Sequence, residues 1–276
     1  MTALQSIVLA ILQGATELFP VSSLGHAVVL PALLRWHIDQ HAPEFLPFLV
    51  MLHLGTATAL LLYFWRDWWA LAIGVLGLTD SHQAAESRRV FMLIVVATIP
   101  AVILGFFAEK FFRNLFGTPV VAAAFLIVNG GLLLFGEKLR GQGHRPLKTL
   151  NAIDALTIGC WQCTALIPGI SRSGATIVGG LLRGIDHEGS AHFSFLIATP
   201  IIVGATALEV PKLLRASVPS GAFELSSVAA VVAGVTAFAS TAFLMRYFRE
   251  HDAWALNPFA YYCFVVGAGS LALLVA

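Results

Sequence analysis

Two short polar segments hold most of the reactive side chains of this sequence. The first, residues 13–26, contains a carboxylate at Glu17, two neighbouring hydroxyls at Ser22 and Ser23, and an imidazole at His26. Ser23 and His26 are three residues apart and share a face if this segment is helical. That spacing suits a nucleophilic hydroxyl with an imidazole that accepts or relays its proton. The plainer alternative is that the serines cap a helix and His26 is a packed interior residue.

The second polar segment, residues 168–176, predicts a site for an anion. Its hydroxyls and glycines, together with a guanidinium, are the groups that recognise phosphate or carboxylate oxygens. These residues are Gly169, Ser171, Arg172, Ser173, Gly174 and Thr176. The segment carries no Walker-type lysine, so it is not the phosphate loop of a nucleotide-driven protein. Its composition alone leaves phosphate and carboxylate open.

Both segments lie in a chain with the composition of a helical membrane protein. Charged residues make up 11% of the sequence, the mean hydropathy is +0.84 and the net charge is +1. Soluble domains have about 25% charged residues, and a nearly neutral chain argues against a nucleic-acid partner. An ionisable group at the bilayer centre costs about 2.5–3.5 kcal/mol and is by default a functional candidate. Glu17 and Arg172 are therefore predicted to meet there, either as a functional pair or as a purely structural ion pair, with Gln13 directed at the same point as Glu17.

Six apolar runs are long enough to span a membrane, which takes roughly 20 residues. They are Phe45–Phe64, Val90–Ala108, Pro119–Phe135, His192–Val210, Ser227–Met245 and Pro258–Val275. The runs Met1–Phe19 and Ala152–Ile167 differ, because a polar segment and then a short second arm follow each one. We expect these two to be re-entrant hairpins whose tips stop near the midplane, where non-helical backbone must be covered by protein or face a water-filled cavity.

This order of elements predicts an all-α integral membrane protein with an inverted repeat. A hairpin returns to its own side of the membrane and three spans do not, so the second half must insert upside down relative to the first. We expect a single membrane domain, 1–276, with halves of approximately 1–140 and 150–276. A shift of about 149 positions places Gln13 on Gln162, Ser22 on Ser171 and Ser23 on Arg172.

Lysines and arginines in the loops predict the orientation. The richer side should be cytoplasmic, and it carries Arg66, Arg88, Arg89, Lys138, Arg140, Arg145, Lys148, Arg246 and Arg249. The other side carries Arg35, Lys110, Arg113, Lys212 and Arg215. Both termini and the first hairpin's opening are therefore expected to face outward.

At its two polar segments the chain resembles the bacterial undecaprenyl-diphosphate phosphatases, the membrane family linked to bacitracin resistance. The resemblance rests on Gln13 through His26, which match Glu/Gln-x-x-x-Glu running into Pro-Val-Ser-Ser-x-Gly-His, and on Pro168 through Thr176, which match Pro-Gly-x-Ser-Arg-Ser-x-x-Thr. It implies removal of the terminal phosphate from a C55 polyprenyl diphosphate, which regenerates the lipid carrier for cell-wall synthesis. It also implies dependence on a divalent cation, Mg²⁺ or Ca²⁺, and a multi-pass protein of the bacterial plasma membrane with its active site open to the outer face.

Carried over residue by residue, the resemblance makes Ser23 the attacking hydroxyl and His26 its proton partner. Glu17 would orient that pair or help to hold the cation, and Arg172 would bind the diphosphate. The substrate pocket would be lined by Gln13, Ser22, Gly169, Ser171, Ser173 and Thr176. Because Gln13 is an amide where many members have a glutamate, Glu17 is the best metal candidate. The phosphoryl acceptor stays open between Ser23 and His26.

The main alternative function is an inverted-repeat transporter of an anion or of the lipid phosphate, because broken helices at the midplane also build carriers. A nucleophile beside a proton acceptor favours the enzyme, since a carrier needs neither. The partners predicted are the polyprenyl diphosphate and membrane lipid. A homodimer and a monomer are both left open.

Overall fold

The computed structural model describes the chain except for residues 37, 39–44, 108–117, 140–144 and 216–219. The described part consists of helices, with one isolated parallel bridge between Arg145 and Ile185 in place of any strand. The helices are α1 (Ala3–Thr16), α2 (Ser23–Leu33), α3 (Phe45–Tyr63), α4 (Trp65–Val75), α5 (Ser81–Phe107), α7 (Pro119–Leu139), α8 (Ala152–Cys163), α9 (Arg172–Leu182), α10 (His187–Arg215), α11 (Ser220–Glu250) and α12 (Asn257–Val275). Two short 3₁₀ helices, Leu147–Thr149 and Thr164–Leu166, join the longer elements.

Four helices in the described part are long and apolar enough to cross a membrane: α5, α7, α11 and α12. A fifth span results if α3 and α4 are counted together, although the chain bends by 76° between them. Length and hydropathy do not add α10 to this set, so they give four to five spans rather than the six expected. Three charges used for the orientation, Lys110, Arg113 and Arg140, lie outside the described residues.

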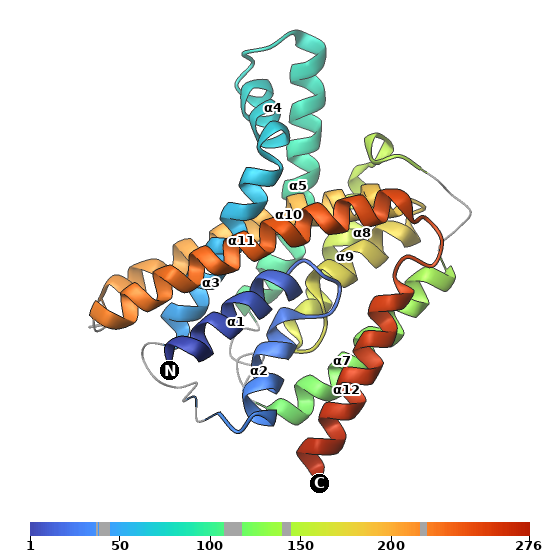
Figure 1. Cartoon of the computed structure of the whole chain (residues 1–276). Coiled ribbons are helices and arrows are strands. Elements are labelled where there is room, and N and C mark those ends of the chain that lie inside the picture. Colours follow the sequence, from blue (N-terminus) through green and yellow to red (C-terminus); the bar gives the residue numbers. More distant parts are fainter. Residues whose placement is uncertain (37, 39–44, 108–117, 140–144, 216–219) are drawn as a thin grey trace.

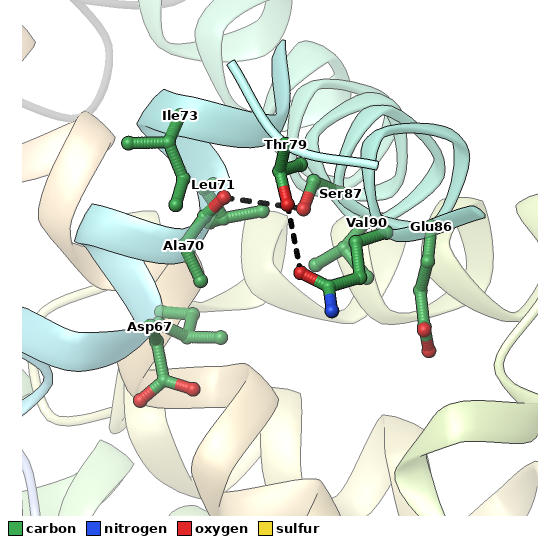
Figure 2. A pocket seen from close by; sticks show the side chains of 10 residues that line it. Asp67, Ala70, Leu71, Ile73, Thr79, Glu86, Ser87 and Val90 are labelled. Carbon is green, nitrogen blue, oxygen red and sulfur yellow. Dashed lines mark hydrogen bonds between the residues drawn. The ribbon is translucent and has the colours of Figure 1, made fainter. Parts of the chain in front are cut away.

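In Figure 1, α4 and the start of α5 project from the rest as a helical hairpin, whereas α7 and α12 lie side by side along the chain's C-terminal end. A groove between α4 and α5 is lined by Asp67, Thr79, Gln83 and Glu86 among others. Thr79 donates to Gln83 at the start of α5. The Ser87 hydroxyl of α5 donates to the Ala70 carbonyl of α4, and Figure 2 marks this bond. The predicted site residues do not line it.

Each predicted hairpin is a pair of short α-helices joined by a turn, which in the second hairpin follows the 3₁₀ helix Thr164–Leu166. The first arms pack on long helices: α1 on α11 and α8 on α5. Gly14 of α1 lies against the Ala233 carbonyl, and Gly159 of α8 lies against the Ala97 carbonyl, at separations that leave no room for a Cβ. Glycine therefore lets each first arm approach its supporting helix backbone to backbone.

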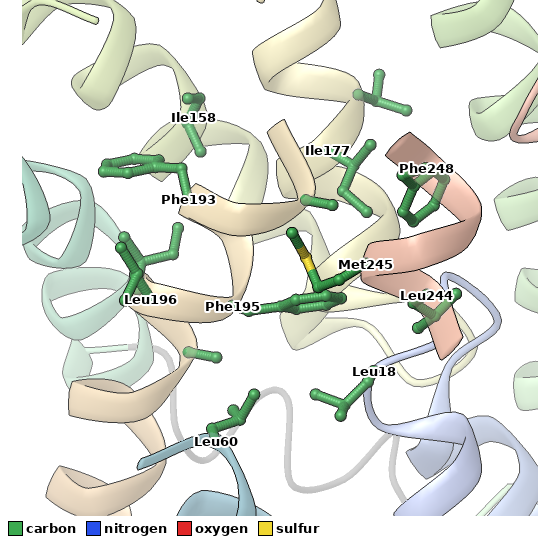
Figure 3. Packing of buried hydrophobic residues seen from close by; sticks show 14 of the residues in the cluster. Leu18, Leu60, Ile158, Ile177, Phe193, Phe195, Leu196, Leu244, Met245 and Phe248 are labelled. Carbon is green, nitrogen blue, oxygen red and sulfur yellow. The ribbon is translucent and has the colours of Figure 1, made fainter. Parts of the chain in front are cut away.

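The main apolar core lies around α9 and α10 and extends to the first tip (Figure 3). Phe195, Leu60 and Leu18 are fully buried there, and they come from α10, α3 and the turn after α1. Within a membrane, packing of this kind stabilises the fold through van der Waals contacts between the helices. The turn that carries Glu17 is therefore held by packing on the core.

Candidate active site

The first tip begins where α1 ends and closes with a cap on α2. Ser22 has a positive φ of 69°, and its Oγ accepts a hydrogen bond of 3.2 Å from the Gly25 N–H. This is the capping role that the sequence allowed for one of the two serines. Because Ser22 is the cap, Ser23 is the first helical residue of α2, and its side chain is free to serve another partner.

Glu17 is the centre of the buried polar cluster at this tip. Its Oε2 accepts 2.5 Å from the Ser23 hydroxyl and 3.1 Å from the Gln13 amide. All three side chains are buried. The geometry confirms that Gln13 and Glu17 converge, and it gives the Ser23 proton a carboxylate acceptor.

Arg172 brings the second tip to the same carboxylate. Its Nη2 lies 3.2 Å from Glu17 Oε1, and both side chains are largely buried, with 13% and 8% of their surface exposed. The expected meeting of the two tips through this ion pair is therefore confirmed. Arg172 is also the first residue of α9, so its backbone stands at a helix N-terminus, where anions are favoured.

His26 has different partners from the one the sequence suggested. Its Nδ1 lies 2.7 Å from the Ser22 carbonyl oxygen, and its Nε2 lies 2.9 Å from the Tyr262 hydroxyl of α12. Ser23 turns instead toward Glu17, because the turn folds that carboxylate back over the start of α2. The described hydrogen bonds thus pair Ser23 with an acid rather than with the imidazole.

The hydroxyls of the second segment make hydrogen bonds to protein atoms, and the bond from Ser173 joins the two tips. Ser173 donates 3.0 Å to the Phe19 carbonyl, and Ser171 accepts 3.1 Å from the Gly174 N–H. Thr176 donates 2.8 Å to the Arg172 carbonyl and also contacts the Ser194 hydroxyl. These hydroxyls were expected to line an oxygen pocket. In this structure they are buried and bond to protein atoms. The two turns lie inside an apolar core, and these hydroxyls take the place of water as hydrogen-bond partners of the backbone.

Gly169 also differs from its expected role. It has a φ of +99°, and a Cβ there would collide with the Ala122 carbonyl and with Phe125 of α7. In this structure, therefore, the missing side chain of Gly169 lets the backbone approach the neighbouring helix α7. The sequence suggested that it would let the backbone approach a bound anion.

Three residues near the tips were missing from the predicted site. His53 of α3 places its Nε2 3.9 Å from Glu17 Oε2. Asn129 of α7 donates 2.9 Å to the Pro20 carbonyl and accepts 2.9 Å from the Ser171 N–H, so it joins both tips. A lone amide inside the apolar run Pro119–Phe135 was a usable signal for Asn129. Nothing in the sequence marked Tyr262.

The side chains available as metal ligands determine how a cation could bind. In the described part of the chain no three His, Cys, Asp or Glu side chains gather as metal ligands. Among the described residues, Glu17 is the one carboxylate at the tips. Its oxygens already accept hydrogen bonds from Ser23, Gln13 and Arg172. The residues fit a cation that takes most of its oxygens from a bound diphosphate, as Mg²⁺ commonly does, and do not fit a resident all-protein site.

Fold and site together define a class: a multi-pass helical membrane protein in which two turns between short helices bring a serine, a carboxylate and an arginine into one buried cluster. Comparison with known proteins specifies the family. The model of the family "Bacitracin resistance protein BacA" matches residues 6–269. The chain belongs to this family.

Named relatives cover nearly the whole chain. An undecaprenyl-diphosphatase of Granulibacter bethesdensis is 66% identical over 99% of this chain and 97% of its own length. Proteins of the same name from Acidiphilium cryptum and Gluconacetobacter diazotrophicus are 57% and 56% identical over 99% of this chain, and over 99% and 98% of their own lengths.

Proposed function

We propose that this protein is a membrane phosphatase that hydrolyses undecaprenyl diphosphate to undecaprenyl phosphate and inorganic phosphate. The observation that carries the proposal is the cluster in which Ser23 donates to Glu17 while Arg172 holds the other oxygen of the same carboxylate. Family membership and relatives named for this activity support it. A carrier has no use for a serine hydroxyl bonded to a buried carboxylate, so the cluster does not favour transport.

Ser23 is the proposed nucleophile. Its hydroxyl proton passes to Glu17, and its oxygen forms a bond to the terminal phosphorus as the bridging P–O bond breaks and polyprenyl phosphate leaves with that oxygen. Water then hydrolyses the phosphoserine to release inorganic phosphate and restore the hydroxyl. Transfer of this kind depends on positioning and on neutralising charge around phosphorus.

Arg172 is the proposed binding group for the phosphate oxygens. Its planar guanidinium can bond two oxygens at once, and the N-termini of α2 and α9 add N–H groups and favourable dipoles. Arg172 already pairs with Glu17, so an incoming phosphate has to share the guanidinium with that carboxylate. Proton transfer from Ser23 to Glu17 neutralises the carboxylate and frees Arg172 for the phosphate.

The divalent cation, Mg²⁺ or Ca²⁺, is proposed to arrive with the diphosphate. It would neutralise oxygens that Arg172 does not reach, with Glu17 and the Gln13 amide oxygen as the nearest protein donors. Chelation should therefore abolish turnover while leaving the unfolding temperature of the substrate-free protein unchanged. A large loss of stability on chelation would instead indicate a resident structural cation.

The inverted repeat is also proposed, and the two hairpins support it at several positions. Both first arms start with a capping box, Thr2 with Gln5 and Asn151 with Asp154. Both second arms are 11 residues long and begin after a serine that caps the N–H three residues on. All these pairs are related by the same offset as Gln13 and Gln162. We propose on this basis six spans with two re-entrant hairpins, counting α3 and α10 as spans, and halves of approximately 1–140 and 150–276 in one domain.

The proposed location is the bacterial plasma membrane, with the site and both termini on the outer side. Loop charges support this orientation, because most lysines and arginines fall on the opposite side. A long prenyl tail would stay in the lipid while the diphosphate reaches the tips.

The test is phosphate release from a polyprenyl diphosphate by the purified protein in nanodiscs. Wild type should release phosphate, and Ser23→Ala should lose on the order of 10³-fold or more in kcat with its unfolding temperature preserved. Ser227→Ala is the matched control, because the hydrogen bond described for that α11 hydroxyl runs to the Phe223 carbonyl of its own helix. Normal turnover by Ser23→Ala would remove Ser23 from the mechanism, and binding or transport without release would favour a carrier.

A further inference from the structure

The hydrogen bonds of His26 determine which of its ring nitrogens carries a proton. A carbonyl oxygen can only accept, so the 2.7 Å contact with the Ser22 carbonyl requires a proton on Nδ1. In the neutral imidazole Nε2 is then an acceptor, and the Tyr262 hydroxyl at 2.9 Å is the donor that fills it. The two rings also stack, with centroids 5.6 Å apart and planes 16° from parallel.

Tyr262 reaches this contact from the exposed side of the molecule. Its side chain is 42% exposed on α12, whereas His26 is 6% exposed on α2. The phenol therefore lies between the surrounding medium and the imidazole, and the contact joins helices 236 residues apart in sequence.

We propose that Tyr262 is a positioning residue that acts through His26. Its hydroxyl donates to the Nε2 lone pair, and so holds the imidazole with Nδ1 protonated, until the O–H of a water takes the place of the phenol. This inference rests on the proposed function, because His26 is relevant only if the cluster turns over a diphosphate.

The hydrogen bonds of His26 assign different proton transfers to Glu17 and His26, the two bases of the first tip. While the phenol occupies Nε2 and the Ser22 carbonyl occupies Nδ1, His26 has no free nitrogen to accept the Ser23 proton. Glu17, bonded to Ser23 at 2.5 Å, accepts it. His26 becomes available only after the phenol is displaced, so it is assigned to the later step in which water attacks the phosphoserine.

The experiment compares Tyr262→Phe with its neighbour control Tyr261→Phe. Phenylalanine keeps the ring that stacks on His26 and removes only the hydroxyl. Tyr261 is 57% exposed and has no described contact with His26, so Tyr261→Phe is the matched change on the same helix.

The direct readout is nitrogen NMR of protein labelled with ¹⁵N-histidine, with the His26 resonances identified by their loss in His26→Gln. We expect wild-type Nδ1 at a protonated frequency and Nε2 at the frequency of a hydrogen-bonded imine nitrogen. Tyr262→Phe should move Nε2 to the frequency of a free imine nitrogen, and Tyr261→Phe should leave it unchanged. An Nε2 resonance insensitive to Tyr262→Phe, or a proton found on Nε2 in wild type, overturns the proposal.

The kinetic readout separates positioning from general structural support. Without the Tyr262 hydroxyl the imidazole is held less firmly in the orientation that the later step needs, and the loss of this neutral hydrogen bond should lower kcat by about threefold to tenfold. KM should stay within about twofold and the unfolding temperature should be unchanged. Equal kcat in Tyr262→Phe and wild type also overturns the proposal. If Ser23→Ala proves active, the proposed mechanism fails, yet the NMR comparison still decides whether Tyr262 holds His26.

Discussion

The two hairpins share a frame and differ in chemistry. In each, a serine caps the second arm: Ser22 caps α2 and Ser171 caps α9. The residue after the cap is Ser23 in the first hairpin and Arg172 in the second, and both side chains reach the Glu17 carboxylate from opposite sides. The same backbone position thus carries the proposed nucleophile in one half and a cation in the other. Capping fixes where the first helical residue points, and the residue type there decides what it does.

Exchanging the two charges tests whether the Glu17–Arg172 contact is more than an ion pair. Each single change, Glu17→Arg or Arg172→Glu, leaves two like charges buried together and should destabilise the protein by about 3–5 kcal/mol. The double variant should recover much of that stability and still lose on the order of 10³-fold or more in kcat. Phosphate release and thermal unfolding measure the two effects. An exchanged protein with near-normal turnover would make the pair purely structural.

Arg172→Lys keeps the charge of the second tip and removes its planar fork. We expect a loss of about 10²-fold in kcat/KM, since a point charge cannot bond two phosphate oxygens in fixed geometry. Arg246→Lys is the control, because that exposed guanidinium pairs with Glu250 one turn along α11. Near-full activity of Arg172→Lys would restrict Arg172 to charge balance.

Acid should loosen the second hairpin before the first. Asp154 of the α8 capping box bonds Arg145 at 2.9 Å and Arg183 at 2.6 Å, whereas the α1 box uses the neutral Gln5. Burial alone would raise the pKa of Asp154, but the hydrogen bonds from both arginines outweigh it and hold that pKa below its ordinary value. A lowered carboxyl pKa gives stability that is present above about pH 4 and is lost as the pH falls further.

Hydrogen exchange of α8 and α1 between pH 6 and pH 3 measures this difference. Relative to the intrinsic exchange rate at each pH, protection should fall in α8 first, and Asp154→Asn should remove this pH dependence while lowering stability by about 2 kcal/mol. An equal fall of protection in both arms would refute the assignment to Asp154.

The smallest effects are expected from the two caps. Ser22→Ala and Ser171→Ala should each lower the free energy of unfolding by about 1 kcal/mol. Of the two, Ser171→Ala should have the larger effect, because the Ser171 hydroxyl also contacts Ser173 at 3.0 Å. Unfolding temperatures compare them. Destabilisation by one of these substitutions and not by the other would mean that the two capped turns are not structurally equivalent.

The sequence was sufficient for the two pairs of short helices and for the meeting of Glu17 with Arg172. Proline, glycine and serine interrupt apolar runs there, and an isolated charge in such a run needs a partner. Hydropathy did not predict that α5 starts at Ser81, because it detects only the apolar part of a helix. The 76° bend after α3 was missed as well, since neither proline nor glycine marks it.

The partners of Ser23 and His26 were beyond sequence reasoning. Helical spacing placed the two side chains on one face, but the turn, with Ser22 at a φ of 69°, brings Glu17 to Ser23 instead. Tyr262 is supplied by a helix at the other end of the chain, and only tertiary packing brings it to His26. Local periodicity predicts elements and faces, and it does not predict which distant element closes a site.

The most direct test is to identify the residue that carries the phosphoryl group during turnover. Wild-type protein is mixed with a polyprenyl diphosphate labelled in its terminal phosphate, quenched in milliseconds in acid and in parallel in base, and digested for peptide analysis. We expect an acid-stable, base-labile label on Ser23 that is absent in Ser23→Ala. An acid-labile, base-stable label on His26 would contradict this expectation.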